Sequence, residues 1–561
     1  MKLDYKKTLK VGTAFAIIMV FWTSYDYVVP LLLENAFGLS NSMRGLIMGL
    51  DNLLSLFMLP LFGKLSDKLV SKYGKRTPFI VVGTVVTVLL MVFVPISATK
   101  QLDKAMELRG RITDTFAEQY SYTAGDGTHY DSAEAIYTML YEKGADNSDF
   151  CDRDYLKANG RDSLGEYLEI ALNGKTDDGF SDDYIRFVKT GITNYANGQV
   201  YENITKNNTA TLVVYMIILF FVLVAMATFR SPAIALMPDV TPKPLRSQAN
   251  AMITLMGGVG GAIAFIIYTV ALTVNPTAYV LVFGLVAAAM ALLLVAYLKL
   301  VKENKLAAEC EELCEKYGID NDDDDSAPVN AETDAAKTAN GGKDSKTAGR
   351  EGLKKAKMTS FLLILASIFM WFMGYNAVQS NLSIYLTKTL GLGAEMGGLV
   401  SGLSMGVSAI AFIPVGMLAV KIGRKKSIVI GFALAVVSFV MVFFFAAHAG
   451  GGVSVLFTVF YLLAGFGLII SNVNTFPMVV ELSTKDKVGR YTGFYYTATM
   501  SAQAITPFIA GLVMDSTGGS KYLFLYSAAC VVVAIVLMMF VRHGDGKPVP
   551  PKSKLEMIGG D

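Results

Sequence analysis

The sequence predicts an all-α membrane protein with twelve transmembrane helices in two pseudo-symmetric six-helix bundles. Two features of the composition point to a membrane. Hydrophobic residues make up 53% of the 561 positions and charged residues only 17%, whereas about a quarter of the residues in soluble domains are charged. The third observation is a series of long apolar stretches, each close to the roughly 20 residues that a helix needs to cross a bilayer.

The apolar stretches fall into two groups of six. The first group comprises 8–33, 43–63, 78–97, 210–237, 248–273 and 277–298, and the second comprises 358–387, 394–419, 427–447, 454–479, 490–514 and 521–541. We therefore predict an N-terminal bundle made of 1–97 and 210–298, a C-terminal bundle at 358–541, and a tail at 542–561.

Two polar segments interrupt this pattern. Residues 98–209 separate the third and fourth stretches, and Asp and Glu outnumber Lys and Arg there. We expect a small, mainly helical domain outside the membrane. Residues 299–357 join the two bundles, starting with an amphipathic helical pattern and continuing into a polar, low-complexity tether.

The basic residues predict the orientation. They gather at the N-terminus, in the loop at 64–76, at 421–426 and in the tail, whereas the short loops on the opposite side hold almost none. Because basic loops stay in the cytoplasm, we predict cytoplasmic N- and C-termini. The segment 98–209 is then extracytoplasmic, and we expect the protein in the plasma (inner) membrane.

The two halves are related in sequence. Residues 45–68 align without a gap on 398–421, with glycines matched at several positions. Setting Tyr25 on Tyr375 brings Asp26 onto Asn376. Internal repeats of this kind occur in transporters whose two halves rock around a central site.

The loop between the second and third stretches reads GKLSDKLVSKYGKRTPF (63–79) and resembles the signature of the major facilitator superfamily. Its ending, GKRTPF, and the segment PAIALMPDVTP (232–242) are similar to sucrose transporters and to the glycoside–pentoside–hexuronide cation symporters. The resemblance covers the membrane core, roughly 10–97, 210–298 and 358–540. It implies the two-bundle fold and cation-coupled uptake of a glycoside.

The sequence departs from this group at two points. Ile234 stands where sucrose transporters carry an arginine, and Arg230 lies one helical turn earlier. Ser55 and Leu59 occupy the positions of the cation-binding acids of melibiose-type symporters. These differences weaken the case for sodium and favour a proton as the coupling ion.

The resemblance also implies a gate at the cytoplasmic ends of the helices. Gly63 would allow two helices to approach closely, and Asp67 would cap a helix N-terminus and pair with basic residues. Val420 replaces the acid in the second half, so the latch is expected to be one-sided. The candidate gate residues are Gly63, Asp67, Arg76, Asp239, Arg246, Glu481 and Arg490.

Asp26, Asp51 and Arg230 are ionisable residues within apolar stretches. Each would cost roughly 2.5–3.5 kcal/mol in lipid, so each should face a partner or a cavity. Asp26 and Asp51 lie at a similar depth, where two carboxylates could share a proton. We predict that they carry the proton and that Arg230 is their coupling partner, with structural hydrogen bonding as the alternative.

Polar side chains next to aromatic ones indicate a candidate substrate site. Sugars suit amide and hydroxyl groups combined with a flat aromatic face. The candidates are Trp22, Tyr25, Trp371, Tyr375, Asn376, Gln379, Asn381, Asn472, Asn474 and Gln503. Hydrogen bonding between helices is the alternative use of these side chains.

Together these patterns predict a monomeric secondary transporter that performs proton-coupled symport of a sugar or glycoside by alternating access. Its partners would be a small-molecule substrate, the proton and the lipid bilayer, with no nucleic acid and no cofactor or metal. The sequence contains no nucleophile–base set, metal motif or phosphate loop, which argues against an enzyme. The alternatives are an exporter or carrier of another small solute, and a non-transporting receptor that uses the external segment.

Overall fold

The computed structural model describes residues 3–116, 121–158, 160–161, 163–176, 179–242, 245–317, 343–393, 422–445, 455–482 and 488–543. Within these residues, eleven helices are long and apolar enough to cross a membrane. They coincide with eleven of the predicted stretches. The remaining stretch, 394–419, lies outside the described residues.

The helices before the linker share one hydrophobic core. They are α1 (Tyr5–Phe37), α2 (Asn41–Lys68), α3 (Thr77–Met91), α4 (Phe93–Asp114), α10 (Thr209–Asp239), α11 (Arg246–Val274) and α12 (Tyr279–Leu300). Helix α1 is the centre of this group and is buried along most of its length, because it packs on α11 and α12. We call this group the first half.

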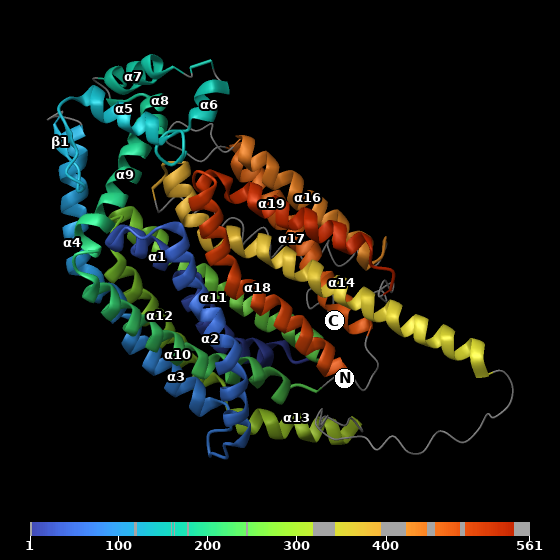
Figure 1. Ribbon diagram of the computed structural model, residues 1–561. Helices are drawn as coiled ribbons and strands as arrows, with labels where there is room; N and C mark the ends of the chain where they lie inside the picture. The colour runs from blue at the N-terminus through green and yellow to red at the C-terminus, as the bar shows by residue number, and fades with distance from the viewer. Residues whose placement is uncertain are drawn as a thin grey trace.

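The helices after the linker form a second core. They are α14 (Lys343–Ile384), the π-helical turn η5 (Tyr385–Thr389), α16 (Arg424–Phe445), α17 (Val455–Glu481), α18 (Val488–Ser516), the 3₁₀ turn η7 (Ser520–Tyr522) and α19 (Leu523–Met539). We call this group the second half. Figure 1 shows the two halves side by side, with the first half in blue to green and the second in yellow to red.

The segment 98–209, which we call the insertion, builds a third core at one end of the molecule (Figure 1). Beyond α4 it contains β1 (Tyr122–Thr123), β2 (His129–Tyr130), α5 (Ala133–Lys143), α6 (Arg153–Ala158), α7 (Leu164–Asn173), β3 (Lys175–Thr176), β4 (Gly179–Phe180), α8 (Asp182–Tyr184), η2 (Ile185–Lys189), α9 (Thr190–Val200) and η3 (Tyr201–Thr205). The strands form two antiparallel hairpins, β1–β2 and β3–β4. Buried Ile136, Leu140 and Val188 fill the space between its helices.

Local sequence signals fix the ends of several helices. Helix α1 starts after Asp4, whose carboxylate accepts a hydrogen bond from the Lys7 amide, and ends at Gly38 with φ of 62°. Helix α7 starts with a capping box formed by Ser163 and Glu166. The linker helix α13 (Glu303–Tyr317) lies at the opposite end of the first half from the insertion (Figure 1), and we call these two ends the linker side and the insertion side.

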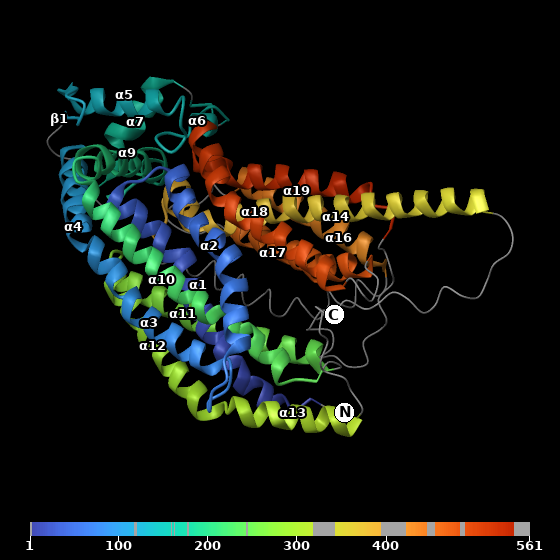
Figure 2. The same cartoon turned by 60° about the horizontal axis from the view of Figure 1, so that its bottom comes forward.

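The two halves meet through α2 and α18 on the insertion side. A Cβ atom on Gly45 would lie 1.9 Å from the carbonyl oxygen of Pro507, so only glycine allows this approach. Asp515, at the end of α18, accepts hydrogen bonds from the amide and the side chain of Asn41. Figure 2 shows the halves together beneath the insertion and diverging toward the linker side.

A methyl group at Gly45 should therefore separate the halves on the insertion side. We expect Gly45→Ala to weaken the dipolar broadening between spin labels on exposed Met43 of α2 and Leu512 of α18. Gly284→Ala is the matched control, because nothing lies within 4 Å of a Cβ there. Unchanged broadening in Gly45→Ala would show that the α2–α18 contact tolerates a side chain.

Candidate functional site

A cavity of about 550 Å³ lies between the two halves and is lined by side chains from both. Many of the residues selected from the sequence line it, and they come from helices far apart in the chain: Trp22, Asp26, Asp51, Arg230, Trp371, Tyr375, Asn376, Gln379 and Gln503. A volume of this size lies within the range of small-molecule sites.

Among the residues that the structure describes, the charged residues of the cavity all belong to the first half. The guanidinium of Arg230 lies within electrostatic range of both Asp26 and Asp51, and the two carboxylates are within range of each other. Asp51 is buried, with 7% of its surface exposed. The structure brings these three groups, which the sequence selected as coupling partners, into one cluster.

Neutral groups hold Arg230 in this position. The carbon at the centre of its guanidinium lies 5.0 Å from the centre of the Trp22 ring, which is a cation–π geometry. One guanidinium nitrogen is 3.5 Å from the Ser55 hydroxyl oxygen. Arg230 lies one helical turn before Ile234, the position at which sucrose transporters carry their arginine. Both residues line the cavity, so the charge of Arg230 still reaches it.

The second half faces this cluster with amides and aromatic rings. The Gln379 side chain hydrogen-bonds to the Asp26 carboxylate, so the two halves are joined directly at the cavity. Trp371 and Tyr375 stack with ring centres 5.8 Å apart and planes 9° from parallel. The Asn376 amide donates to the Phe372 carbonyl of its own helix while the residue still lines the cavity.

Three of the predicted substrate contacts lie elsewhere. Tyr25 is 1% exposed and packs between aromatic rings of α1. Asn381 and Asn474 are buried, and each donates its side-chain amide to a carbonyl one turn earlier in its own helix. Among the described residues these three do not line the cavity. The side chain of Asn472 lies outside the described residues.

The structure adds lining residues that the sequence did not single out: Thr23, Asn52, Tyr268, Ser380 and Tyr461. Tyr268 stacks on Tyr27 with ring centres 4.6 Å apart. Tyr268 and Tyr461 each lie in an apolar helix, and a lone tyrosine in such a helix is equally typical of a position at the lipid interface. Only the packing of α11 and α17 shows that Tyr268 and Tyr461 reach the cavity.

Part of the predicted gate forms a compact cluster on the linker side of the first half. Arg76 pairs with Asp67 at 2.5 Å and with Asp239 at 2.7 Å, and its guanidinium also hydrogen-bonds to Ser66. A Cβ on Gly63 would lie 3.1 Å from the hydroxyl oxygen of Ser231, so α2 and α10 approach closely there. Burial lowers the pKa of Arg76, but the hydrogen bond and charge of Asp239 and the charge of Asp67 outweigh it and raise the pKa overall.

Asp67 does not cap a helix N-terminus as expected from the sequence, because it lies in the last turn of α2. Glu303 of α13 takes that role. Its carboxylate accepts hydrogen bonds from the amides of Lys75, Arg76 and Thr77 at the start of α3, with distances of 2.7–3.2 Å. Because the sequence places Glu303 in a linker far from α3, no local signal identifies it. The side chains of Arg246, Glu481 and Arg490 lie outside the described residues.

The fold and its cavity define a multi-pass membrane protein of the transporter class, with two helical halves around a central site. The chain belongs to the Major Facilitator Superfamily, whose sequence profile matches residues 204–478 and 364–559. A second profile, described as MFS/sugar transport protein, matches residues 11–103.

Two solved structures share this fold. The D-xylose–proton symporter superposes with a TM-score of 0.52 at 14% identity and covers 98% of this chain and 100% of its own. A bacterial homologue of the human lysosomal transporter Spinster, in an inward-facing and occupied conformation, gives a TM-score of 0.52 at 12% identity over 96% and 97% of the two chains. A protein from Geobacillus stearothermophilus, named as uncharacterized and encoded in the sodM 3′ region, is 28% identical over 189 residues, which are 33% of this chain and 86% of that protein.

The arginine cluster yields a prediction about stability. Arg76→Gln leaves the carboxylate of Asp239 without its closest partner, so we expect the free energy of unfolding to fall by about 3 kcal/mol. Thermal unfolding of the detergent-solubilised protein measures the change. Lys75→Ala is the control, because the Lys75 side chain is 43% exposed and its ammonium lies 3.5 Å from the same carboxylate. This variant should change stability by less than about 0.5 kcal/mol. Equal effects of the two variants would contradict this role of Arg76.

Proposed function

We propose that the protein is a secondary active transporter that couples proton movement to the symport of a sugar or glycoside by alternating access. The observation that carries the proposal is the composition of the cavity. Asp26, Asp51 and Arg230 line one side of it, and amide and aromatic side chains of the second half line the other. This combination provides a place for a proton next to groups that suit a neutral, hydroxyl-rich solute.

The proton chemistry rests on charge balance. With both aspartates ionised, the cluster with Arg230 carries a net charge of −1, and one bound proton makes it neutral. A net charge in the interior of a membrane protein is costly, so protonation and solute binding favour the same rearrangement of the halves. Gln379 connects this chemistry to the second half, because its bond to Asp26 must change when the halves move.

The sugar assignment has two further supports. The match of residues 11–103 to the profile named MFS/sugar transport protein covers the helices that carry Asp26 and Asp51. The D-xylose–proton symporter has the same fold, and its name combines the two elements of the proposal. The motifs at 63–79 and 232–242 extend the proposal to the sucrose-transporter and glycoside–pentoside–hexuronide group.

The proposed topology follows from the basic residues. The linker side, with the Arg76 cluster, is cytoplasmic, the insertion is extracytoplasmic, and the protein acts as a monomer in the plasma membrane. The conformation described here then faces inward, since the halves touch on the insertion side. The Arg76 cluster forms the first-half part of a cytoplasmic gate. In this reading the chain divides into the two bundles, the insertion at 98–209, the linker at 299–357 and the tail.

One observation favours a second candidate function. The lining contributed by Phe15, Ile18 and Met19, one to two turns before Trp22 on α1, is apolar. A site with an apolar and a charged end suits an amphipathic solute, which would be carried or exported on the same fold.

Counterflow in proteoliposomes separates these functions. We expect preloaded unlabelled sugar or glycoside to drive uptake of the same radiolabelled compound. Tyr375→Ala should reduce this uptake at least about tenfold at low substrate concentration, because it removes an aromatic face from the cavity. No exchange of any sugar, together with export of an amphipathic dye, would contradict the sugar assignment.

Proton coupling is tested with variants that keep the size of the aspartate side chain but remove its charge. We expect Asp26→Asn and Asp51→Asn each to abolish pH-driven accumulation while counterflow, which needs no net proton movement, is retained. Asp103→Asn, at an exposed site of α4, is the control and should accumulate normally. Normal pH-driven accumulation by both cavity variants would remove the support for their role.

A further inference from the structure

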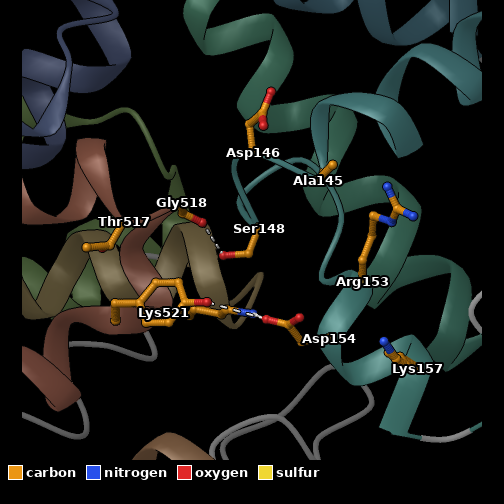
Figure 3. Close-up of a pocket in the computed structure, with 11 residues that line it drawn as sticks. Ala145, Asp146, Ser148, Arg153, Asp154, Lys157, Thr517, Gly518 and Lys521 are labelled. Carbon is orange, nitrogen blue, oxygen red and sulfur yellow. Dashed lines mark hydrogen bonds and ion pairs between the residues drawn. The ribbon is translucent and has the colours of Figure 1, made fainter.

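The insertion is bonded to the half of the protein to which it does not belong in the chain. It begins within α4 and leads into α10, both in the first half. Its loop between α5 and α6 nevertheless lies against the turn between α18 and α19 in the second half, as Figure 3 shows. Contacts of this kind must change whenever the two halves move apart on the insertion side.

Hydrogen bonds form the centre of this contact. The amide and hydroxyl of Ser148 both donate to the carbonyl oxygen of Gly518, at 2.5 and 2.7 Å. The Asp149 carboxylate accepts from the amide and hydroxyl of Ser520, at 2.9 and 2.7 Å. Asp149 and Ser520 are both buried, so water does not replace these bonds in this conformation.

An ion pair lies beside these bonds. The ammonium of Lys521 is 2.8 Å from a carboxylate oxygen of Asp152 and 2.8 Å from one of Asp154. Hydrogen bonding and charge from Lys521 hold the pKa of Asp154 below its ordinary value. The side chain of Lys521 is 11% exposed and that of Asp152 is 28% exposed, so solvent screens this pair less than the pair with Asp154, whose side chain is 76% exposed.

The backbone of the turn is shaped for this approach. Gly518 has φ of 93°, a conformation that other residues rarely adopt. A Cβ there would lie 2.7 Å from the carbonyl oxygen of Asp146 in the insertion. The turn between α18 and α19 can therefore reach the insertion only with glycine at this position.

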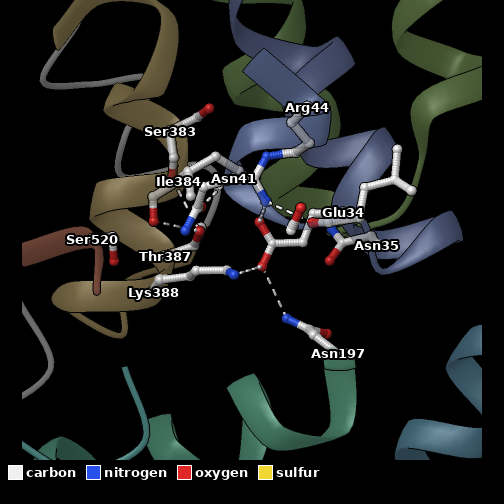
Figure 4. A network of polar contacts seen from close by, with 12 residues as sticks. Glu34, Asn35, Asn41, Arg44, Asn197, Ser383, Ile384, Thr387, Lys388 and Ser520 are labelled. Atoms are coloured by element: carbon white, nitrogen blue, oxygen red, sulfur yellow. Dashed lines mark hydrogen bonds and ion pairs between the residues drawn. The ribbon is translucent and has the colours of Figure 1, made fainter. Parts of the chain in front are cut away.

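A second contact joins both halves and the insertion at Glu34 of α1 (Figure 4). One carboxylate oxygen accepts from Asn197 of the insertion at 3.1 Å and pairs with Lys388 of η5 at 3.3 Å. The other oxygen pairs with Arg44 of α2 at 3.1 Å. Asn194 of the insertion also donates to the carbonyl oxygen of Lys388 at 3.3 Å. A buried acid thus has partners in three parts of the protein.

We propose that the insertion is a clamp that holds the two halves together on the insertion side and thereby sets the conformational equilibrium of the transporter. Separation of the halves there breaks the bonds of Ser148, Asp149 and Lys521 to their partners and the pair between Glu34 and Lys388. Because these bonds exist only while the halves are together, each of them favours the conformation seen here. The proposal requires alternating access, not the identity of the solute or the coupling ion.

The clamp can be tested by thiol accessibility. Met48 of α2 lines the cavity, is 5% exposed, and lies between Gly45 and Gly49, which both contact α18. A cysteine there becomes accessible from the insertion side only when the halves separate on that side. A membrane-impermeant maleimide is applied to the membrane face identified by labelling of Leu172→Cys, an exposed position on the insertion.

The native cysteines give little background. All four are buried, and burial together with the charge of Asp152 raises the pKa of the Cys151 thiol to about 12. In the Met48→Cys protein we expect Asp149→Asn combined with Lys521→Gln to raise the labelling rate about fivefold to tenfold, which is the effect of losing one or two net hydrogen bonds. Lys521→Arg with native Asp149 keeps the charge and should retain the parental rate.

Asp183→Asn is the matched control. Asp183 pairs with Arg161 at 2.6 Å within the insertion, so this variant loses an acid and an ion pair of the insertion without touching the second half. Its labelling rate should equal that of the parent. An unchanged rate in the Asp149→Asn, Lys521→Gln protein, or an equal rise in Asp183→Asn, would overturn the clamp.

Discussion

Asp26, Asp51 and Arg230 place opposite charges in a part of the protein that the bilayer surrounds, where an isolated charge is expensive. Their mutual proximity satisfies this constraint, and all three still line the cavity. The ring face of Trp22 lies against the guanidinium of Arg230. A cluster that is balanced only at one protonation state is a natural place for a proton to affect how the halves pack.

The rest of the structure connects this cluster to movement. Gln379 reaches Asp26 from the second half, so the charge state of the cluster and the contact between the halves are linked at one hydrogen bond. On the insertion side, glycine contacts between α2 and α18 and the bonds of the insertion hold the halves together. On the linker side, the described contacts of Arg76 and Glu303 lie within the first half and α13 and do not reach the second half.

The fold was predictable because hydropathy depends on local sequence. Eleven apolar stretches coincide with spanning helices, and charges within them identified the lining residues Asp26, Asp51 and Arg230. The amide candidates were less reliable, since Asn381 and Asn474 bond to their own helices. Helix rotation decides whether a side chain faces the cavity, and one sequence does not reveal it. Long-range contacts such as that of Glu303 with α3 had no sequence signal.

The cluster at the cavity is tested most directly by infrared difference spectroscopy of the purified protein between alkaline and acidic pH. A protonated carboxyl in an apolar site has a C=O stretching band separate from that of a carboxylate. If Asp26 and Asp51 hold the transported proton, the wild type gains such a band on acidification, and Asp26→Asn or Asp51→Asn removes or shifts it. The assignment of the proton to these residues would be contradicted if the wild type shows no such band, or if both variants show the same band as the wild type.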